Sequence, residues 1–281
     1  MMKKGAVVAE KYVIKEALGK GGSSDVFLVK DIQRKCLYTM KVSSDKALLK
    51  REARLTGEIN SRYFPAFVDF EEKEEGAYLV LEYIEGTSLQ SLIDGGQRFS
   101  EKESLTIMEH VTAALSVLHH HKTPLVHLDI KPANIIITPR GEVRIIDMGA
   151  GSIVGMGKGK TGGTYGYGAP EQFKAGAFPG PAADVYACGK LMRYLLTGKN
   201  PTHPPYEVEK RRLYGKRRYL QRLIKKCLEP EPDRRYPNAG ILHKEIRMLQ
   251  ERGEKGRQLT KKVKPDVIYV KCIWKSDYER V

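Results

Sequence analysis

VHLDIKPAN, at residues 126–134, is the segment from which the fold of this chain can be worked out. It places an acid, a base and an amide, Asp129, Lys131 and Asn134, on one short loop between apolar runs. A carboxylate accepts a proton from a hydroxyl group, an ammonium neutralises a phosphate, and carboxylate and amide oxygens bind a hard cation. The spacing therefore predicts phosphoryl transfer, for which positioning and charge neutralisation supply most of the catalysis.

The composition is that of a globular chain with a basic surface. It has 281 residues, 41% of them hydrophobic and 30% charged, which suits a two-lobed domain or a pair of domains. The net charge is +15, and basic residues concentrate at 210–226 and after Arg252. Because no aromatic residues interleave them as in a nucleic-acid-binding motif, nucleic acid is an unlikely target, and we consider an acidic partner for both regions.

Four cysteines stand singly, with no CxxC pair: Cys36, Cys188, Cys227 and Cys272. This pattern predicts free buried thiols in a reducing compartment. No apolar run approaches the roughly 20 residues of a membrane helix, and the apolar stretch after residues 1–4 is too short for a signal peptide. We therefore expect a cytoplasmic protein without a membrane segment.

The first part of the chain alternates β-like runs with turns, at residues 12–14, 18–29 and 36–42. This alternation predicts an antiparallel sheet. Gly19, Gly21 and Gly22 could form a flap whose backbone N–H groups cover phosphates, with Val26 over a base, although a tight hairpin also uses glycine. A strand and not a helix follows the glycines, so a P-loop or a dinucleotide-binding crossover fits poorly.

A helix is predicted from Lys46 to Ile59, with Ser44 or Asp45 as its N-cap. Its apolar stripe would contain Leu48, Glu52, Leu55 and Ile59. A carboxylate in such a stripe needs a partner, and Lys41 on the preceding strand is the candidate, with its ammonium directed at a nucleotide phosphate. The alternative is a solvated Glu52 at the edge of the stripe.

The apolar strand at 77–86 turns polar and ends at glycine, which predicts a boundary between two lobes. An adenine ring could hydrogen-bond to exposed backbone there, near Glu82 and Ile84. Beyond it, Ser100 and Glu103 form a capping-box pattern at the start of a helix. The core-facing stripe of that helix would contain Leu105, Met108, Val111, Leu115 and Leu118.

Two short runs, 135–137 and 143–146, predict a hairpin that returns Asp147 beside Asn134. These side chains would supply two oxygen ligands for Mg²⁺. An isolated aspartate before a turn is usually a turn residue, so the prediction depends on this position. Residues 150–168 are rich in glycine and predict an activation or substrate loop.

In their order and spacing, these residues resemble the eukaryotic-type protein kinase family over about residues 12–250. The resemblance implies an α+β, bilobal protein kinase fold and a small soluble member like those of bacteria. An antiparallel β-sheet N-lobe would occupy residues 1–85 and a mainly helical C-lobe residues 86–252. A basic tail would follow at 253–281, where the apolar run 267–274 is either an added strand or a docking segment.

The resemblance implies an ATP-dependent Ser/Thr protein kinase acting on a protein substrate. Asp129 would accept the hydroxyl proton, and Lys131 would neutralise the γ-phosphate, which indicates a Ser/Thr acceptor. Lys41, held by Glu52, would bind the ATP phosphates. The Mg²⁺ ligands would be Asn134 and Asp147, and the other ATP-binding residues Gly19, Gly21, Gly22, Val26, Glu82 and Ile84.

The same resemblance assigns roles to the later part of the chain. Residues 163–171 resemble the segment that holds a peptide acceptor, and Glu171 would pair with Arg235 as a structural clamp. Asp184 resembles a buried aspartate that fixes the backbone of the catalytic loop, and without the resemblance it would be an ordinary acid at a helix N-terminus. Candidate autophosphorylation sites are Ser152, Thr161 and Thr164, although Thr164 is expected to contact the catalytic loop.

Three residues depart from the family pattern: Ser24 at a usual glycine, Leu128 at a usual arginine and Met148 at a usual phenylalanine. Leucine cannot hydrogen-bond to a phosphate, so we hypothesise that activity does not require phosphorylation of the activation loop. These departures favour a pseudokinase or nucleotide-binding scaffold as the alternative. A small-molecule phosphotransferase is the second alternative, and Lys131 and the sequence at 169–171 speak against it.

Overall fold

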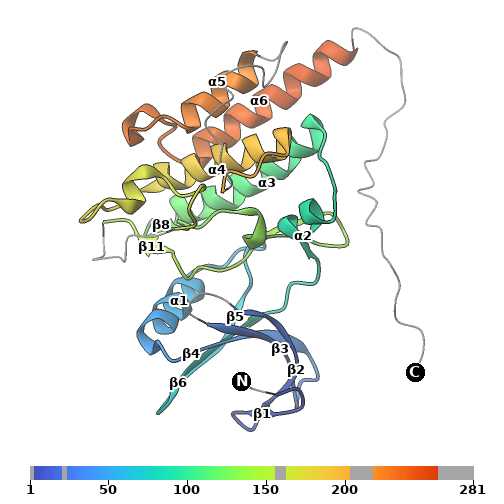
Figure 1. The fold of residues 1–281 in the computed structure, drawn as a ribbon, viewed down its shortest axis with the longest axis vertical. Helices are drawn as coiled ribbons and strands as arrows, with labels where there is room; N and C mark the ends of the chain where they lie inside the picture. The colour runs from blue at the N-terminus through green and yellow to red at the C-terminus, as the bar shows by residue number, and fades with distance from the viewer. Residues whose placement is uncertain (1–2, 21–23, 156–162, 203–217, 259–281) are drawn as a thin grey trace.

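A six-stranded antiparallel sheet forms the N-terminal lobe, below the helices in Figure 1. The computed structural model describes residues 3–20, 24–155, 163–202 and 218–258. The strands of this sheet are β1 (Val7–Val8), β2 (Tyr12–Lys20), β3 (Asp25–Asp31), β4 (Leu37–Ser43), β5 (Phe67–Lys73) and β6 (Gly76–Glu82). Their order across the sheet is β1-β2-β3-β4-β6-β5, so the predicted antiparallel sheet is confirmed.

Strand β6 is buried from Ala77 to Leu81 because both faces of the sheet are covered there. Tyr78 and Val80 pack in a cluster with residues of β2, β3 and β4, whereas Leu79 and Leu81 pack against helix α1 (Lys46–Glu58). Successive residues of a strand point to opposite faces, so a strand buried on both sides shows no polar alternation.

Helix α1 begins where the sequence predicts, and the Asp45 carboxylate accepts a hydrogen bond of 3.0 Å from the backbone N–H of Leu48. Its buried face is slightly rotated from the predicted stripe. Leu49 is buried and Leu48 is only half-buried, while Glu52 and Leu55 are buried as predicted. The sheet therefore sets which side of the helix faces inward.

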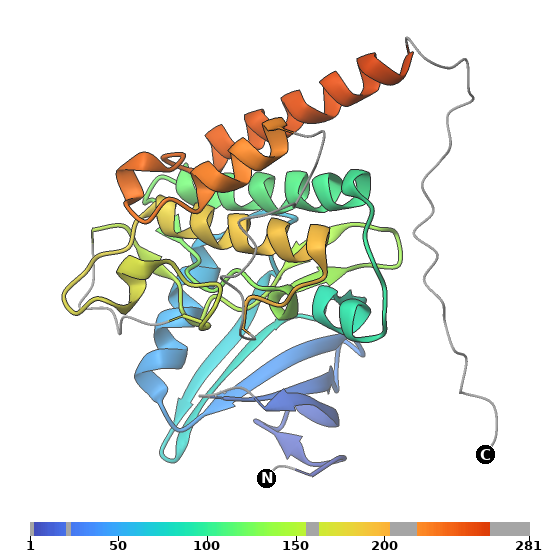
Figure 2. The ribbon, with the colours of Figure 1, turned by 45° about the horizontal axis from the view of Figure 1, so that its top comes forward.

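The C-terminal lobe is helical, as expected. Its helices are α2 (Leu89–Asp94), α3 (Glu101–His119), α4 (Pro181–Thr197), α5 (Arg218–Cys227) and α6 (Ala239–Gln258). In Figure 2, the green, yellow and red helices α3, α4 and α6 lie above one another on the side away from the sheet. Helix α6 continues to Gln258, past residue 253, where the predicted tail starts.

Short strands connect the helices to the segment 127–134. They are β7 (Thr87–Ser88), β8 (Leu125–Val126), β9 (Ile135–Ile137), β10 (Val143–Ile145) and β11 (Ser152–Ile153). The predicted hairpin is confirmed, because β9 and β10 pair antiparallel with Ile135 opposite Ile145. Strand β7 adds to this hairpin, and the linker between β6 and β7 contains the predicted lobe boundary at residue 85.

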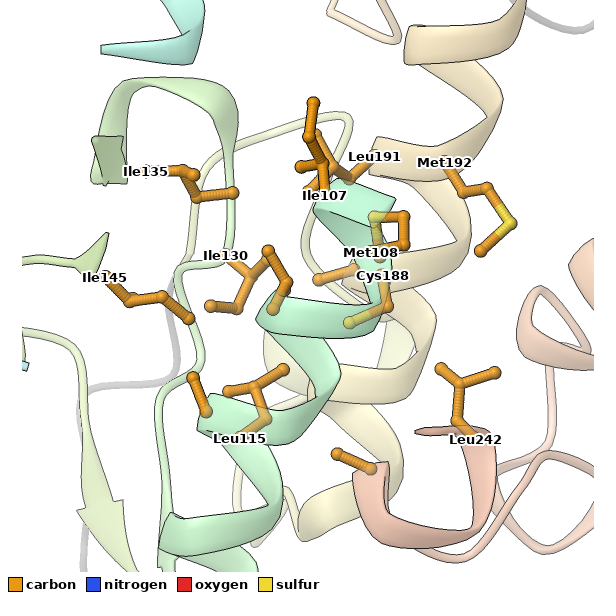
Figure 3. Close-up of a cluster of buried hydrophobic side chains, with 14 of the residues drawn as sticks. Ile107, Met108, Leu115, Ile130, Ile135, Ile145, Cys188, Leu191, Met192 and Leu242 are labelled. Carbon is orange, nitrogen blue, oxygen red and sulfur yellow. The ribbon is translucent and has the colours of Figure 1, made fainter. Parts of the chain in front are cut away.

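The main apolar core lies between α3, α4, α6 and this hairpin (Figure 3). The predicted stripe of α3 is buried throughout, and its Ser100 and Glu103 form the predicted capping box. Ile130 is fully buried in this core between the half-buried Asp129 and Lys131. The core therefore anchors the loop 127–134 through Ile130 and leaves the side chains of Asp129 and Lys131 partly exposed.

The cysteines only partly follow the prediction. Cys188 and Cys227 are free and buried in the core, but Cys36 is exposed next to the turn between β3 and β4, so its predicted burial is wrong. Cys272 and the apolar run 267–274 lie outside the described residues. Among the helices that the structure describes, none combines the length and apolar character needed to cross a bilayer.

Candidate active site

Three predicted nucleotide-binding residues lie side by side across the sheet. Gly19 on β2 is opposite Val26 on β3, and Val26 is opposite Lys41 on β4. Directly opposed residues of neighbouring strands project to the same face, so these positions form one continuous row. Gly21 and Gly22 lie outside the described residues, and Ser24 is half-buried just before β3.

Lys41 connects the sheet to helix α1 and to the second lobe. Its Nζ atom lies 2.5 Å from Oε1 of Glu52 and 2.8 Å from Oδ1 of Asp147. Burial alone would lower the pKa of Lys41, but the two carboxylates raise it above its ordinary value. The ammonium is therefore charged, and it holds a residue of α1 and a residue after β10 together.

Asp147 stands in a tight turn after β10, with a left-handed φ of 71°. Its Oδ1 atom also accepts a hydrogen bond of 3.0 Å from the backbone N–H of Gly149. Burial would raise the pKa of Asp147, but the neighbouring Lys41 ammonium and this N–H lower it to about 2. The side chain is thus an anion at neutral pH, and 40% of it is exposed.

The hairpin brings Asp147 next to Asn134. The backbone N–H of Ile146 donates to the carbonyl of Asn134 at 2.9 Å. The Asn134 Nδ2 atom donates to the carbonyl oxygen and to Oδ2 of Asp129, at 2.9 and 3.1 Å. Because the amide nitrogen is used in this way, the amide oxygen of Asn134 is the atom that remains for a ligand.

The carboxylate of Asp129 is held by donors on both oxygens. Oδ2 accepts from Lys131 Nζ at 2.7 Å, and Oδ1 accepts from the hydroxyl and the backbone N–H of Thr164 at 2.7 and 3.2 Å. Lys131 also donates to the Thr164 hydroxyl at 2.8 Å. Asp129, Lys131 and Thr164 therefore form a closed ring of hydrogen bonds, which confirms the predicted contact of Thr164 with this loop.

The backbone of this loop is fixed from below by Asp184 on α4. This fully buried carboxylate accepts from the backbone N–H groups of His127 and Leu128 at 2.9 and 2.7 Å. His119 Nε2 donates to it at 2.9 Å, because His119 Nδ1 accepts from the N–H of Ala239. Burial would raise the pKa of Asp184, yet these donors hold it below its ordinary value.

Leu128 occupies an unusual backbone conformation, with φ of 62°, which a leucine adopts only when its surroundings impose it. Its N–H is bound by Asp184, and its carbonyl accepts from Gln172 Nε2 at 2.8 Å. The leucine side chain is 9% exposed and packs with Val126, Ala169 and Ala183. Within the described residues, the Leu128 side chain therefore makes apolar packing contacts.

Arg235 forms the predicted clamp with Glu171. Two guanidinium nitrogens bind the two carboxylate oxygens at 2.6 and 2.8 Å. The remaining donors of the buried Arg235 reach the carbonyls of Glu229, Ala182 and Pro230. Such a fully used, bidentate guanidinium ties the segment after Thr164 to α4 and to the turn before α6.

Glu82 and Ile84 lie where β6 leaves the sheet, and both are half-buried. The Glu82 carboxylate binds Arg144 at 2.8 Å and the N–H of Ala66 at 3.1 Å. Its side chain therefore connects the two lobes. Its backbone N–H donates to the carbonyl of Ala66 at 2.8 Å, so its backbone carbonyl is the group that remains for the adenine contact predicted there.

Several residues that hold this site together were not assigned a role from the sequence. Arg51, His119, Arg144 and Gln172 bind, respectively, Gly149, Asp184, Glu82 and Leu128. Gln172 had a detectable signal, because it lies three residues after Ala169, whose N–H it caps at 2.9 Å. The others contact residues 62 to 98 positions away, a distance at which local patterns give no signal.

Comparison with known proteins gives a consistent result. The chain matches the protein kinase domain over residues 12–246. It is 33% identical over 214 residues to the Serine/threonine-protein kinase PknA of Mycobacterium tuberculosis, covering 70% of this chain and 49% of that protein. It is 29% identical over 209 residues to PrkC of Bacillus subtilis, covering 70% of this chain and 32% of that protein.

A third relative, Serine/threonine-protein kinase D of Synechocystis, is 29% identical over 276 residues, covering 86% of this chain and 53% of that protein. The chain thus spans between a third and about half of the length of these relatives. The match over residues 12–246, together with the two-lobed fold, shows that the chain belongs to the protein kinase domain family.

Proposed function

We propose that this chain is a Ser/Thr protein kinase that transfers the γ-phosphoryl group of ATP to a hydroxyl group of a protein. The observation that carries the proposal is the ring formed by Asp129, Lys131 and Thr164, with a fixed carboxylate beside a cation. Transfer of labelled phosphate from ATP to serine or threonine of a protein acceptor tests it. Labelling of tyrosine alone would contradict it.

In this proposal, Asp129 orients the acceptor hydroxyl and takes its proton. Its two oxygens already accept hydrogen bonds in defined directions, so an incoming hydroxyl would exchange for the Thr164 contact without reorienting the carboxylate. Lys131 would neutralise charge on the transferred group. Lys41, kept in place by Glu52, would bind the phosphates of ATP, and the row Gly19, Val26 and Lys41 would cover the nucleotide.

The side chains of Asn134 and Asp147 are chemically suited to bind a magnesium ion. Both offer hard oxygen donors, the Asp147 carboxylate is anionic and partly exposed, and the Asn134 nitrogen is already used by Asp129. When bound, Mg²⁺ would neutralise the phosphates of ATP. The ATP-binding part would comprise residues 1–85, the catalytic part residues 86–252, and the tail residues 253–281.

We also infer that activity does not depend on a phosphorylated activation loop, because the Leu128 side chain is packed among apolar residues. A phosphate acts through new charge-assisted hydrogen bonds, which leucine cannot offer. Complete dephosphorylation, verified by intact mass, is expected to change kcat/KM by less than about twofold. The phosphatase is removed before the assay, and a large loss of activity that returns on autophosphorylation would contradict the inference.

The exposed side of α5 supports the proposed acidic partner. Arg218, Arg222, Lys225 and Lys226 are exposed there, while Leu223 and Ile224 face the core. Residues 210–217 of this basic region and the tail from 259 lie outside the described residues. Changing Arg222 and Lys225 to Ala should weaken binding of a poly-glutamate peptide by about fivefold at low salt.

The matched control for this change replaces two exposed lysines elsewhere, Lys102 and Lys122, with Ala. Equal weakening by the two double variants would show only the effect of net charge, and the α5 surface would then not be the binding site.

A further inference from the structure

We propose that Arg51 is a positioning residue that fastens the turn Asp147–Gly149 to helix α1. Its Nη2 atom donates a hydrogen bond of 2.6 Å to the carbonyl oxygen of Gly149, which lies 98 residues later in the chain. The inference deepens the proposed kinase function, on which the role of Asp147 as a metal ligand rests. By this inference, two residues of helix α1, Arg51 and Glu52, hold Asp147 in position.

Arg51 and Glu52 hold the turn Asp147–Gly149 from adjacent positions on α1. Consecutive residues of a helix project about 100° apart, so the two side chains reach different parts of the same turn. Glu52 acts through the Lys41 ammonium, which binds Asp147 Oδ1, and also accepts a hydrogen bond from the backbone of Met148. Arg51 donates to the carbonyl oxygen of Gly149, so it fixes the main chain at the end of the turn, beyond the part that Glu52 contacts.

The turn requires such support because of its conformation. Asp147 has φ of 71°, a left-handed conformation that a residue other than glycine keeps only when neighbouring contacts impose it. The turn is also packed closely, since a Cβ atom on Gly149 would lie 3.0 Å from Asp147 Oδ1 and 3.5 Å from Glu52 Oε2. A small shift of Gly149 would therefore displace the Asp147 carboxylate.

Met148, which lies between Asp147 and Gly149, holds the turn less firmly than the phenylalanine usual at this position in the family would. Met148 is 3% exposed and packs in the main core, but methionine is flexible and defines its position less tightly than a rigid ring. The hydrogen bond from Arg51 to Gly149 therefore restrains the turn more tightly than the packing of the Met148 side chain alone.

The surroundings of the guanidinium support this assignment. Arg51 is half-buried, and its buried Nε atom has no hydrogen-bond partner among the described residues. Burying an unpaired donor is unfavourable, so the side chain is kept in this place by its other contacts. The charge-assisted bond to Gly149 is the contact that the structure provides there.

The test compares Arg51→Met with Arg54→Met, because Arg54 is an exposed arginine on the same helix. Hydrogen exchange of the free chain reports on the turn without any assay of activity. Arg51→Met is expected to accelerate exchange in peptides covering residues 147–153, while Arg54→Met leaves it as in the wild type. Arg51→Lys retains a donor and should restore slow exchange at least in part.

A second measurement is the Mg²⁺ concentration needed for half-maximal phosphoryl transfer. Arg51→Met should raise it by about tenfold, the effect of one charge-assisted hydrogen bond, and leave the KM for the protein acceptor unchanged. If Arg51→Met does not fold, Arg51→Gln takes its place in both measurements. Wild-type exchange and wild-type Mg²⁺ dependence in the variant would overturn the inference.

The two proposals fail in distinguishable ways. A wild-type chain that transfers no phosphate contradicts the kinase proposal, whereas faster exchange in Arg51→Met would still support the positioning of the turn. An active wild type with an unaffected Arg51→Met variant overturns the positioning role and leaves the kinase proposal intact.

Discussion

Replacing Asp129 with Asn is expected to lower kcat for phosphoryl transfer by about 10² to 10⁴-fold, the contribution of a positioned general base. The substitution keeps the size of the side chain but removes its charge and its basicity. One carboxylate oxygen of Asp129 now accepts from Lys131 and Asn134, and the other accepts from Thr164. The substitution replaces one of these two acceptors with an NH₂ group, which can only donate. The acceptor hydroxyl would then lack its partner.

Nucleotide affinity should change little in this variant, because Lys41, Glu52 and Asp147 form a separate group of contacts. Steady-state kinetics with a protein acceptor and nucleotide binding measured by fluorescence check the two parts. Asp94→Asn on the exposed side of α2 is the matched control and should behave as the wild type. An Asp129→Asn variant with unchanged kcat would contradict the role assigned to this carboxylate.

Replacing Arg235 with Met should reduce the free energy of unfolding by about 3 to 5 kcal/mol, since it removes one partner of a buried ion pair. The guanidinium is fully buried and binds both oxygens of Glu171 as well as three backbone carbonyls. Without it, the Glu171 carboxylate, of which 13% is exposed, stays largely buried and unpaired. Thermal unfolding should then begin at a clearly lower temperature.

Two further variants separate the buried pair from a general effect of lost charge. Arg247→Met removes an arginine whose side chain is 58% exposed and lies 3.8 Å from Glu109, and it should cost less than about 1 kcal/mol. Adding Glu171→Gln to Arg235→Met should recover part of the loss, because it removes the unpaired charge. Equal destabilisation by Arg235→Met and Arg247→Met would contradict the clamp.

Much of this site could be predicted because its residues follow short, regular patterns. Asp129, Lys131 and Asn134 share one loop, and the hairpin between 135 and 145 is marked by two apolar runs and a turn. The Glu52 carboxylate in an apolar stripe required a cation, and Lys41 was the nearest one on a strand. In these cases the local pattern and the tertiary contacts agree.

Other features depend on contacts that no local pattern contains. The buried face of α1 includes Leu49 and not Leu48, because packing against β6 rotates the helix. Arg51 resembles any surface arginine of a helix until the chain brings Gly149 to it. Cys36 was expected to be buried from residue type alone, but it follows a turn at the exposed start of β4.

The most direct test of the proposed function is the mass of a protein acceptor and of its peptides after incubation with the purified chain, Mg²⁺ and ATP. We expect added phosphate on serine or threonine of the acceptor with the wild type, and none above background with Asp129→Asn. A wild type that binds nucleotide but leaves the acceptor unmodified across a panel of proteins would contradict the account and favour a nucleotide-binding scaffold.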